Sequence, residues 1–142
     1  MRHPLQPVLV HFPIACWSLA TVADIASPWW GEPAWRLAGM LLVVGTVTAI
    51  AAMATGFVEL MKVRNDSPAI GDIHRHMSLV VGAWTLYAAS LFLRLHGTTL
   101  TRPGAVDIAL SVGGFLLLCA GAWFGGKLVY GYRLGVTTGP QP

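Results

Sequence analysis

Residues 37–58 read LAGMLLVVGTVTAIAAMATGFV, a run of 22 residues between Arg36 and Glu59 that contains no Asp, Glu, Lys or Arg. A helix of about 20 apolar residues crosses the hydrocarbon core of a bilayer, and about 18 residues already make a candidate span. Three other runs meet this length, with 21 charge-free residues at 3–23, 18 at 76–93 and 19 at 108–126. The chain is therefore expected to cross a membrane four times.

The composition of the whole chain agrees with this expectation. Only 11% of its 142 residues are charged and 55% are hydrophobic, whereas a soluble domain carries about 25% charged residues. An ordinary soluble enzyme is excluded, and four spans leave room for a single membrane domain over residues 1–142. The net charge of +3 does not indicate a nucleic-acid partner, because the basic residues are scattered at the ends of apolar runs and form no patch.

Each apolar run is expected to form an α-helix, since the runs are too long for barrel strands and do not alternate with a period of two. Turn-forming residues at 27–33, 65–68 and 98–104 separate the runs. The sequence predicts an all-α, four-helix transmembrane bundle in the lipid bilayer, with spans at about 8–27, 35–61, 74–96 and 105–131.

An even number of spans puts both chain termini and the second loop on one side of the membrane. That side carries six basic residues and the other side carries three, namely Arg2, Lys62, Arg64, Arg75, Lys127 and Arg133 against Arg36, Arg94 and Arg102. Because cytoplasmic loops are enriched in Lys and Arg, the termini are expected in the cytoplasm.

Stripes of small residues predict which helix faces meet, because small side chains let membrane helices approach closely. The third helix has such a stripe at Ser78, Gly82, Thr85 and Ala89. Stepping back four residues from Ser78 reaches His74, which is therefore expected to point inward, with His76 pointing outward. The other predicted inward stripes are Gly45, Ala49, Ala52 and Gly56 in the second helix, Gly114, Gly121 and Gly125 in the fourth, and His11, Ala15 and Ser18 in the first. Asp24 falls on another face of the first helix, and Arg36 is its expected partner.

Polar side chains at membrane depth are by default candidates for function. The predicted topology brings five of them to one end of the bundle, namely His11, Glu59, His74, Lys127 and Tyr130. Two inward imidazoles at similar depth predict b-type haem bound between His11 and His74, with His76 as the alternative ligand. In that site Lys127 and Arg75 would neutralise the propionates, and Tyr130 would hydrogen-bond one of them.

Other interpretations of the same residues stay open. His11, His74 and Glu59 also suit a first-row transition metal ion, and each histidine alone could simply be hydrated at the headgroup level. Glu59 and Lys127 could be interface residues whose charged ends extend to the headgroup level, or they could form an ion pair. An electron carrier with a membrane or soluble redox partner is favoured over a stand-alone enzyme. A non-catalytic membrane subunit, a homo-oligomer and an ion pathway between Asp24 and Glu59 are the alternatives.

The chain resembles a bacterial family of predicted membrane proteins known as domain of unknown function 2231. The motifs that carry the resemblance are His3-Pro4, Val10-His11-Phe12-Pro13-Ile14, Thr55-Gly56-Phe57, Gly125-Gly126-Lys127-Leu128-Val129-Tyr130 and Gly135-Val136. The resemblance implies a four-span domain of the bacterial inner membrane and no established activity. Tyr132 stands where the family commonly has a histidine, so a ligand from that position in relatives would be missing here.

Overall fold

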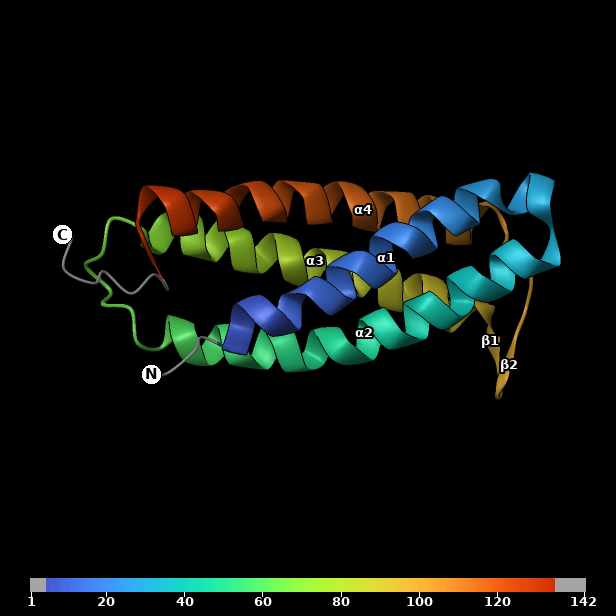
Figure 1. Cartoon of the computed structure of the whole chain (residues 1–142), viewed down its shortest axis with the longest axis horizontal. Helices are drawn as coiled ribbons and strands as arrows, with labels where there is room; N and C mark the ends of the chain where they lie inside the picture. The colour runs from blue at the N-terminus through green and yellow to red at the C-terminus, as the bar shows by residue number, and fades with distance from the viewer. Residues whose placement is uncertain (1–4, 135–142) are drawn as a thin grey trace, which may run out of the picture.

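The computed structural model describes residues 5–134, which form four long helices (Figure 1). The elements are α1 (Leu5–Trp30), α2 (Glu32–Leu60), α3 (Ile70–Arg94), β1 (Leu95–His96), β2 (Thr99–Leu100), α4 (Ala105–Gly126) and one π-helical turn, η1 (Lys127–Gly131). All four helices are long and apolar enough to cross a membrane. The all-α, four-helix architecture predicted from the sequence is confirmed.

The helices extend beyond several of the predicted boundaries. The first was expected to end near residue 27, yet α1 continues through Pro28 to Trp30. A proline near the end of a helix removes one amide donor but does not have to end the helix. The turn is made by Gly31, whose φ of 66° is readily adopted only by glycine. Glu32 and Pro33 then begin α2, because proline suits the first positions of a helix.

The third connection contains the only β-structure within residues 5–134. β1 and β2 pair antiparallel, with Leu95 opposite Leu100 and His96 opposite Thr99. Gly97, at a φ of 65°, makes the tight turn between them. The third helix therefore ends at Arg94 and not at the expected residue 96.

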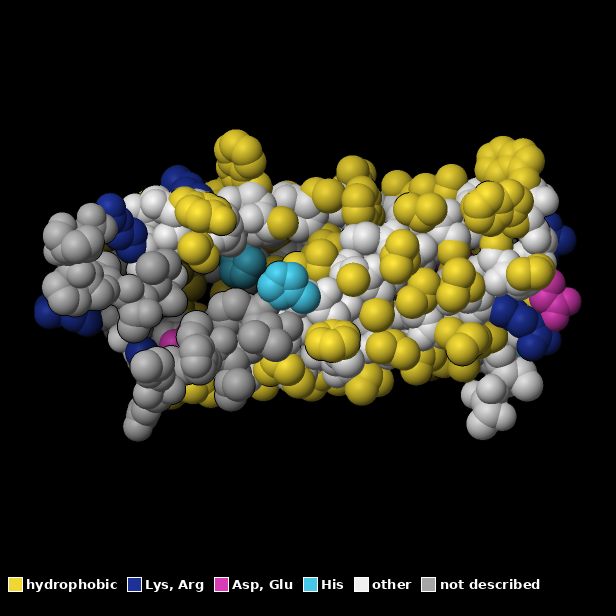
Figure 2. Space-filling view, in the orientation of Figure 1, with side chains coloured by type: hydrophobic (Ala, Val, Ile, Leu, Met, Phe, Trp, Pro, Cys, Tyr) yellow, Lys and Arg dark blue, Asp and Glu magenta, His cyan; other side chains and the backbone are white. Residues whose placement is uncertain are grey.

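The helices pack as two antiparallel pairs, α1 along α2 and α3 along α4, with fewer contacts between α1 and α4. The described chain begins and ends at the same end of the bundle as the α2–α3 loop, called here the loop-2 end (Figure 1). Hydrophobic side chains cover the middle of the bundle, and charged side chains gather at its two ends (Figure 2). This distribution is that of a protein embedded in a bilayer.

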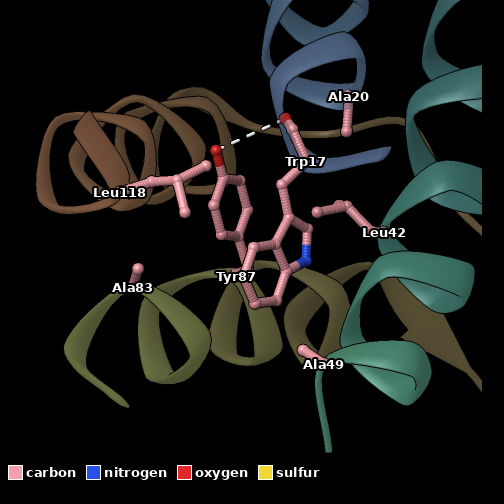
Figure 3. Close-up of a cluster of buried hydrophobic side chains, with 7 residues drawn as sticks. All are labelled: Trp17, Ala20, Leu42, Ala49, Ala83, Tyr87 and Leu118. Carbon is pink, nitrogen blue, oxygen red and sulfur yellow. Dashed lines mark hydrogen bonds between the residues drawn. The ribbon is translucent and has the colours of Figure 1, made fainter. Parts of the chain in front are cut away.

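Two aromatic rings from α1 and α3 organise the core. Trp17 stacks on Tyr87 with ring centroids 4.8 Å apart and planes at 11°, and the Tyr87 hydroxyl donates to the Trp17 carbonyl oxygen (Figure 3). Leu42 and Leu118 pack around this pair from α2 and α4. Because the stack joins the two helix pairs, it fixes how α1 and α3 are rotated about their axes.

The rotation of two helices differs from the one predicted from small residues. On α3 the buried positions are Asp72, Ile73, Ala83, Tyr87, Ser90 and Arg94, whereas Ser78 and Thr85 of the expected inward stripe are exposed. On α1 the expected stripe also fails, since His11 and Ala15 are exposed while Trp17 and Asp24 are buried. Large aromatic and polar side chains occupy these interfaces, so small residues mark them poorly. The predicted inward positions Gly45, Ala49, Gly114 and Gly121 are buried.

Gly45 lets α2 approach the core ring of Trp17, and its replacement by alanine is expected to destabilise the fold. A Cβ at position 45 would lie 2.7 Å from Trp17 Cδ1, and that ring is buried and stacked, so it has no room to move. Overpacking of this kind costs about 1–3 kcal/mol. Thermal unfolding of Gly45→Ala in detergent, followed by circular dichroism, should show a lower midpoint than the wild-type protein. Gly126→Ala is the control, because a Cβ there meets nothing within 4 Å, and its midpoint should not fall.

Candidate functional site

The histidine that faces the bundle interior is His76 and not His74. His76 is half-buried between α3 and α4, whereas His74 is exposed, so the predicted orientations of the two residues are reversed. The two positions lie about 200° apart around a helix, and the Trp17–Tyr87 stack turns the His76 side inward. His74 therefore loses the geometric basis on which it was chosen as a ligand.

One ring nitrogen of His76 is engaged by α4. Its Nδ1 lies 2.8 Å from the carbonyl oxygen of Gly121. Since a carbonyl oxygen only accepts hydrogen bonds, Nδ1 is the donor, and in the neutral ring Nε2 then carries the lone pair. Gly125 lets the ring lie against α4, because a Cβ there would be 3.1 Å from His76 Cε1. Metal-ligating histidines commonly have this arrangement, in which a backbone carbonyl orients the ring and fixes its tautomer.

His11 lies on α1 at nearly the same level of the bundle as His76. One contact fixes the register of α1 against α4: the Thr21 hydroxyl donates to the carbonyl oxygen of Ser111. Gly121, which bonds to His76, lies ten residues after Ser111, or about 15 Å along α4 toward the loop-2 end. Because α1 runs antiparallel to α4, ten residues back from Thr21 cover the same distance in the same direction and end at His11.

Beyond His76, toward the loop-2 end, a charged cluster surrounds the buried carboxylate of Asp72. Lys127 Nζ lies 2.7 Å from Asp72 Oδ2, and Arg75 Nη1 lies 3.1 Å from Oδ1. The Tyr132 hydroxyl donates to Oδ2 at 3.1 Å. The basic side chains Lys127 and Arg75 therefore lie about one helical turn from His76, with one carboxylate between two cations.

The π-helical turn η1 determines which tyrosine reaches this cluster. The Tyr132 amide bonds to the Lys127 carbonyl, five residues back, so the chain advances one residue more per turn than in an α-helix. Lys127 and Tyr132 are thereby directed toward Asp72, while Tyr130 is 87% exposed. The predicted contribution of Tyr130 to an interior site is not supported, and Tyr132 occupies the place expected for it.

Glu59 lies away from this cluster. It is exposed and forms an ion pair with Lys62 at 2.7 Å, so the predicted pairing of Glu59 with Lys127 is wrong. No group of three His, Cys, Asp or Glu side chains that could hold a metal ion occurs within residues 5–134. The combination of His11, His74 and Glu59 is therefore not assembled in the described part of the chain.

At the opposite end a buried ion pair joins α1 to α3. Arg94 binds Asp24 through both terminal nitrogens at 2.8 and 3.0 Å, and the side chains are 1% and 0% exposed. The expected partner of Asp24, Arg36, pairs instead with Glu32 on its own helix. Both Asp24 and Arg94 lie inside spans, where an ionised side chain needs a partner, and this signal was available in the sequence.

Hydroxyl groups complete the hydrogen bonds of the buried pair. Ser111 donates to Asp24 Oδ2 at 2.6 Å, and Arg94 Nη2 donates to Ser90 Oγ at 2.8 Å. The Thr21 hydroxyl continues the polar network to Tyr87 at 2.8 Å. Beyond Tyr87 the apolar core begins, with Leu42, Ala83 and Leu118. With Asp24 held by Arg94 and Glu59 at the surface, the predicted ion pathway between Asp24 and Glu59 has no structural support.

One protein family matches nearly the whole chain. It is described as predicted membrane protein (DUF2231), and the match covers residues 2–138. The chain belongs to this family. Among curated proteins and among solved structures, nothing matches the chain. As a DUF2231 member with four helices able to span a bilayer, it is a multi-pass membrane protein, as the sequence predicted.

The family match includes Tyr132, the position at which the resemblance described above implied a histidine. Here the Tyr132 hydroxyl donates to Asp72, and an imidazole N–H is likewise able to donate to a carboxylate. Either tyrosine or histidine at position 132 could therefore donate a hydrogen bond to Asp72.

Proposed function

We propose that the protein binds b-type haem at the loop-2 end, where His76 and His11 would hold it, and acts in electron transfer in the membrane. The observation that carries this proposal is the bond from His76 Nδ1 to the Gly121 carbonyl, which leaves Nε2 as the ligating atom. His11 is exposed on α1, but the count of helical residues from the Thr21–Ser111 contact puts it near the level of His76, which is why it is the proposed second ligand. The protein would be a carrier or a membrane subunit in a redox chain, with its partner still to be identified.

The donor set favours haem over a bare metal ion. A bare first-row ion usually takes three or four protein ligands, and no group of three ligating residues occurs within residues 5–134. The porphyrin supplies four nitrogens itself, so one or two imidazoles from the chain are sufficient. When bound, haem would supply reversible one-electron chemistry.

The surrounding residues have distinct roles in this proposal. His76 and His11 hold the iron, and the Gly121 carbonyl orients the His76 ring. Lys127 and Arg75 carry two positive charges, and Asp72 neutralises one of them. The remaining positive charge would attract the propionate groups of haem at the headgroup level. Trp123 and Tyr130, both exposed on the last helix, are placed to anchor this end in the membrane interface.

The absorption spectrum of the detergent-purified protein tests the proposal directly. After expression with an adequate haem supply, a Soret band and the split visible bands of a reduced six-coordinate haem are expected. Elemental analysis of the same sample should find iron in proportion to protein. A preparation with no Soret band would refute the haem proposal, and stoichiometric zinc or copper without haem would favour a bare metal site.

The second candidate is a non-catalytic membrane subunit. It is favoured by the Asp24–Arg94 network, in which both ionised groups are satisfied within the chain and none is left to react. A colourless, metal-free protein that copurifies stoichiometrically with one partner would support this function instead.

The sidedness of the bundle is part of the proposal. The loop-2 end would face the cytoplasm of a bacterial cell, since five of the eight basic residues within residues 5–134 lie at that end. In spheroplasts, an impermeant maleimide should label a cysteine introduced by Thr98→Cys in the outer hairpin. It should label Asn65→Cys in the α2–α3 loop only after the membrane is broken, and labelling of Asn65→Cys in intact spheroplasts would reverse the orientation.

A further inference from the structure

The two ends of the bundle differ in charge. Within residues 5–134 the loop-2 end carries five basic and three acidic side chains, namely Lys62, Arg64, Arg75, Lys127 and Arg133 with Glu59, Asp66 and Asp72. The opposite end carries three of each, namely Arg36, Arg94 and Arg102 with Asp24, Glu32 and Asp107. One end is therefore cationic and the other neutral.

A surface pocket lies in the α2–α3 loop at the cationic end. It is a shallow depression, wide open to its surroundings, with a volume of about 520 Å³. Its polar lining is Lys62, Arg64, Asp66 and Ser67, and its apolar lining is Val63, Pro68 and Leu134. Two basic side chains against one acidic side chain, beside an apolar wall, match an anionic lipid headgroup together with the start of its acyl chains.

The pocket is positioned at the boundary of the hydrocarbon region. Phe57, Val58 and Met61 near the end of α2 are exposed and apolar, and the exposed charged pair Glu59–Lys62 begins within the same helical turn. An exposed apolar surface that gives way to charged side chains within about one turn marks the headgroup level. The pocket therefore lies where the phosphates of the lipids are.

The loop that forms the pocket is held by its own hydrogen bonds. The Ser67 amide donates to the Arg64 carbonyl at 3.0 Å, and the Ile70 amide donates to the Ser67 carbonyl at 3.1 Å. The Ser67 side-chain oxygen accepts from the Ala69 amide at 3.3 Å, which leaves its hydroxyl hydrogen to donate to a ligand. Little ordering of the backbone is needed on binding.

The basic side chains of the pocket are engaged only by weak surface ion pairs. Lys62 binds Glu59 at 2.7 Å and Arg64 binds Asp66 at 2.9 Å, and all four side chains are about half-exposed or more. Exposed pairs of this kind contribute little to stability, so a phosphate can take over the cations without a large penalty.

We infer that this pocket binds the phosphodiester headgroup of an anionic phospholipid. Lys62 and Arg64 hold the phosphate, Ser67 donates a hydrogen bond to it, and Val63 and Leu134 lie along the first part of the lipid tails. The inference is independent of the haem proposal, because none of these residues touches His76 or its partners in the described hydrogen bonds and ion pairs.

Lipid titration of the purified full-length protein tests the inference. The protein in neutral detergent is mixed with phosphatidylglycerol or phosphatidylcholine, and bound lipid is counted by native mass spectrometry. Wild-type protein should retain phosphatidylglycerol in preference. The double variant Lys62→Gln/Arg64→Gln should weaken this binding by roughly 10- to 30-fold, since each basic residue near an anionic surface contributes about one kcal/mol.

The matched control removes two arginines from the neutral end. Arg36→Gln/Arg102→Gln changes the net charge by the same amount and also alters exposed side chains, and it should change binding less than twofold. Equal retention of phosphatidylglycerol by wild-type protein and Lys62→Gln/Arg64→Gln, with unchanged helix content, would overturn the inference. Displacement of the lipid by millimolar inorganic phosphate would also overturn it, because the pocket would then be a site for free phosphate.

Discussion

Replacing Asp24 by alanine is expected to destabilise the protein more than any other single substitution considered for this chain. The change leaves the guanidinium of Arg94, 1% exposed, without the carboxylate that receives two of its hydrogen bonds. Removing one partner of a buried pair costs about 3–5 kcal/mol, because the remaining charge is uncompensated. Heat or dodecyl sulfate unfolding of Asp24→Ala in one detergent, followed by circular dichroism, should show a large loss of folded protein relative to the wild-type chain.

Two further variants distinguish the loss of the Asp24–Arg94 ion pair from a general destabilisation of the helix. Asp24→Leu/Arg94→Leu removes both charges together and should recover most of the stability, since an apolar pair needs no desolvation of ions. Glu32→Ala breaks the exposed pair with Arg36 at the same end, where the side chains are 60% and 64% exposed, and should cost at most about 0.5 kcal/mol. A double variant no more stable than Asp24→Ala would contradict the assignment.

Replacing His76 by alanine is expected to abolish the Soret band of the purified protein. The substitution removes the ring whose Nδ1 bonds to the Gly121 carbonyl and whose Nε2 is the proposed ligand. The control His74→Ala lies two residues away on the same helix and is exposed, so its spectrum should match that of the wild-type protein. Spectra normalised to protein, with pyridine haemochrome quantification, measure the haem content of each variant.

His11→Ala should behave differently from His76→Ala. Loss of the second axial ligand would shift the spectrum toward a five-coordinate form while the iron remains held by His76. Circular dichroism of each variant shows whether the helices are retained, so that loss of haem is not confused with loss of fold. If His74→Ala lost the band and His76→Ala kept it, the assignment of His76 would be wrong.

The number and type of the transmembrane elements could be predicted because they depend on local properties of the chain. A charge-free run such as residues 37–58 must form a helix in lipid, whatever its neighbours are. The helix ends were less predictable. A proline such as Pro28 is typical of a helix end, yet α1 continues past it and the turn depends on the positive φ of Gly31.

The candidate site was predicted only in part. The sequence predicted that polar groups, His11 and Lys127 among them, gather at the loop-2 end. The small-residue stripe through Ser78, however, predicted the wrong rotation of α3 about its axis, and His74 was therefore chosen as the inward histidine. Small residues mark where backbones approach, yet the aromatic pair Trp17 and Tyr87 occupies the centre of this bundle. Stripes on α2 and α4 were assigned correctly at Gly45 and Gly121, which contact large side chains of α1 and α3.

The sequence by itself determined that the chain spans a membrane four times as helices, because hydrophobic length and backbone hydrogen bonding in lipid are satisfied within each segment. Only the tertiary structure decided that Asp24 meets Arg94, 70 residues away, and that His76 faces α4. These contacts depend on the rotation of each helix about its axis. That rotation is set by the packing of Trp17 on Tyr87 between two helices, which no single segment contains.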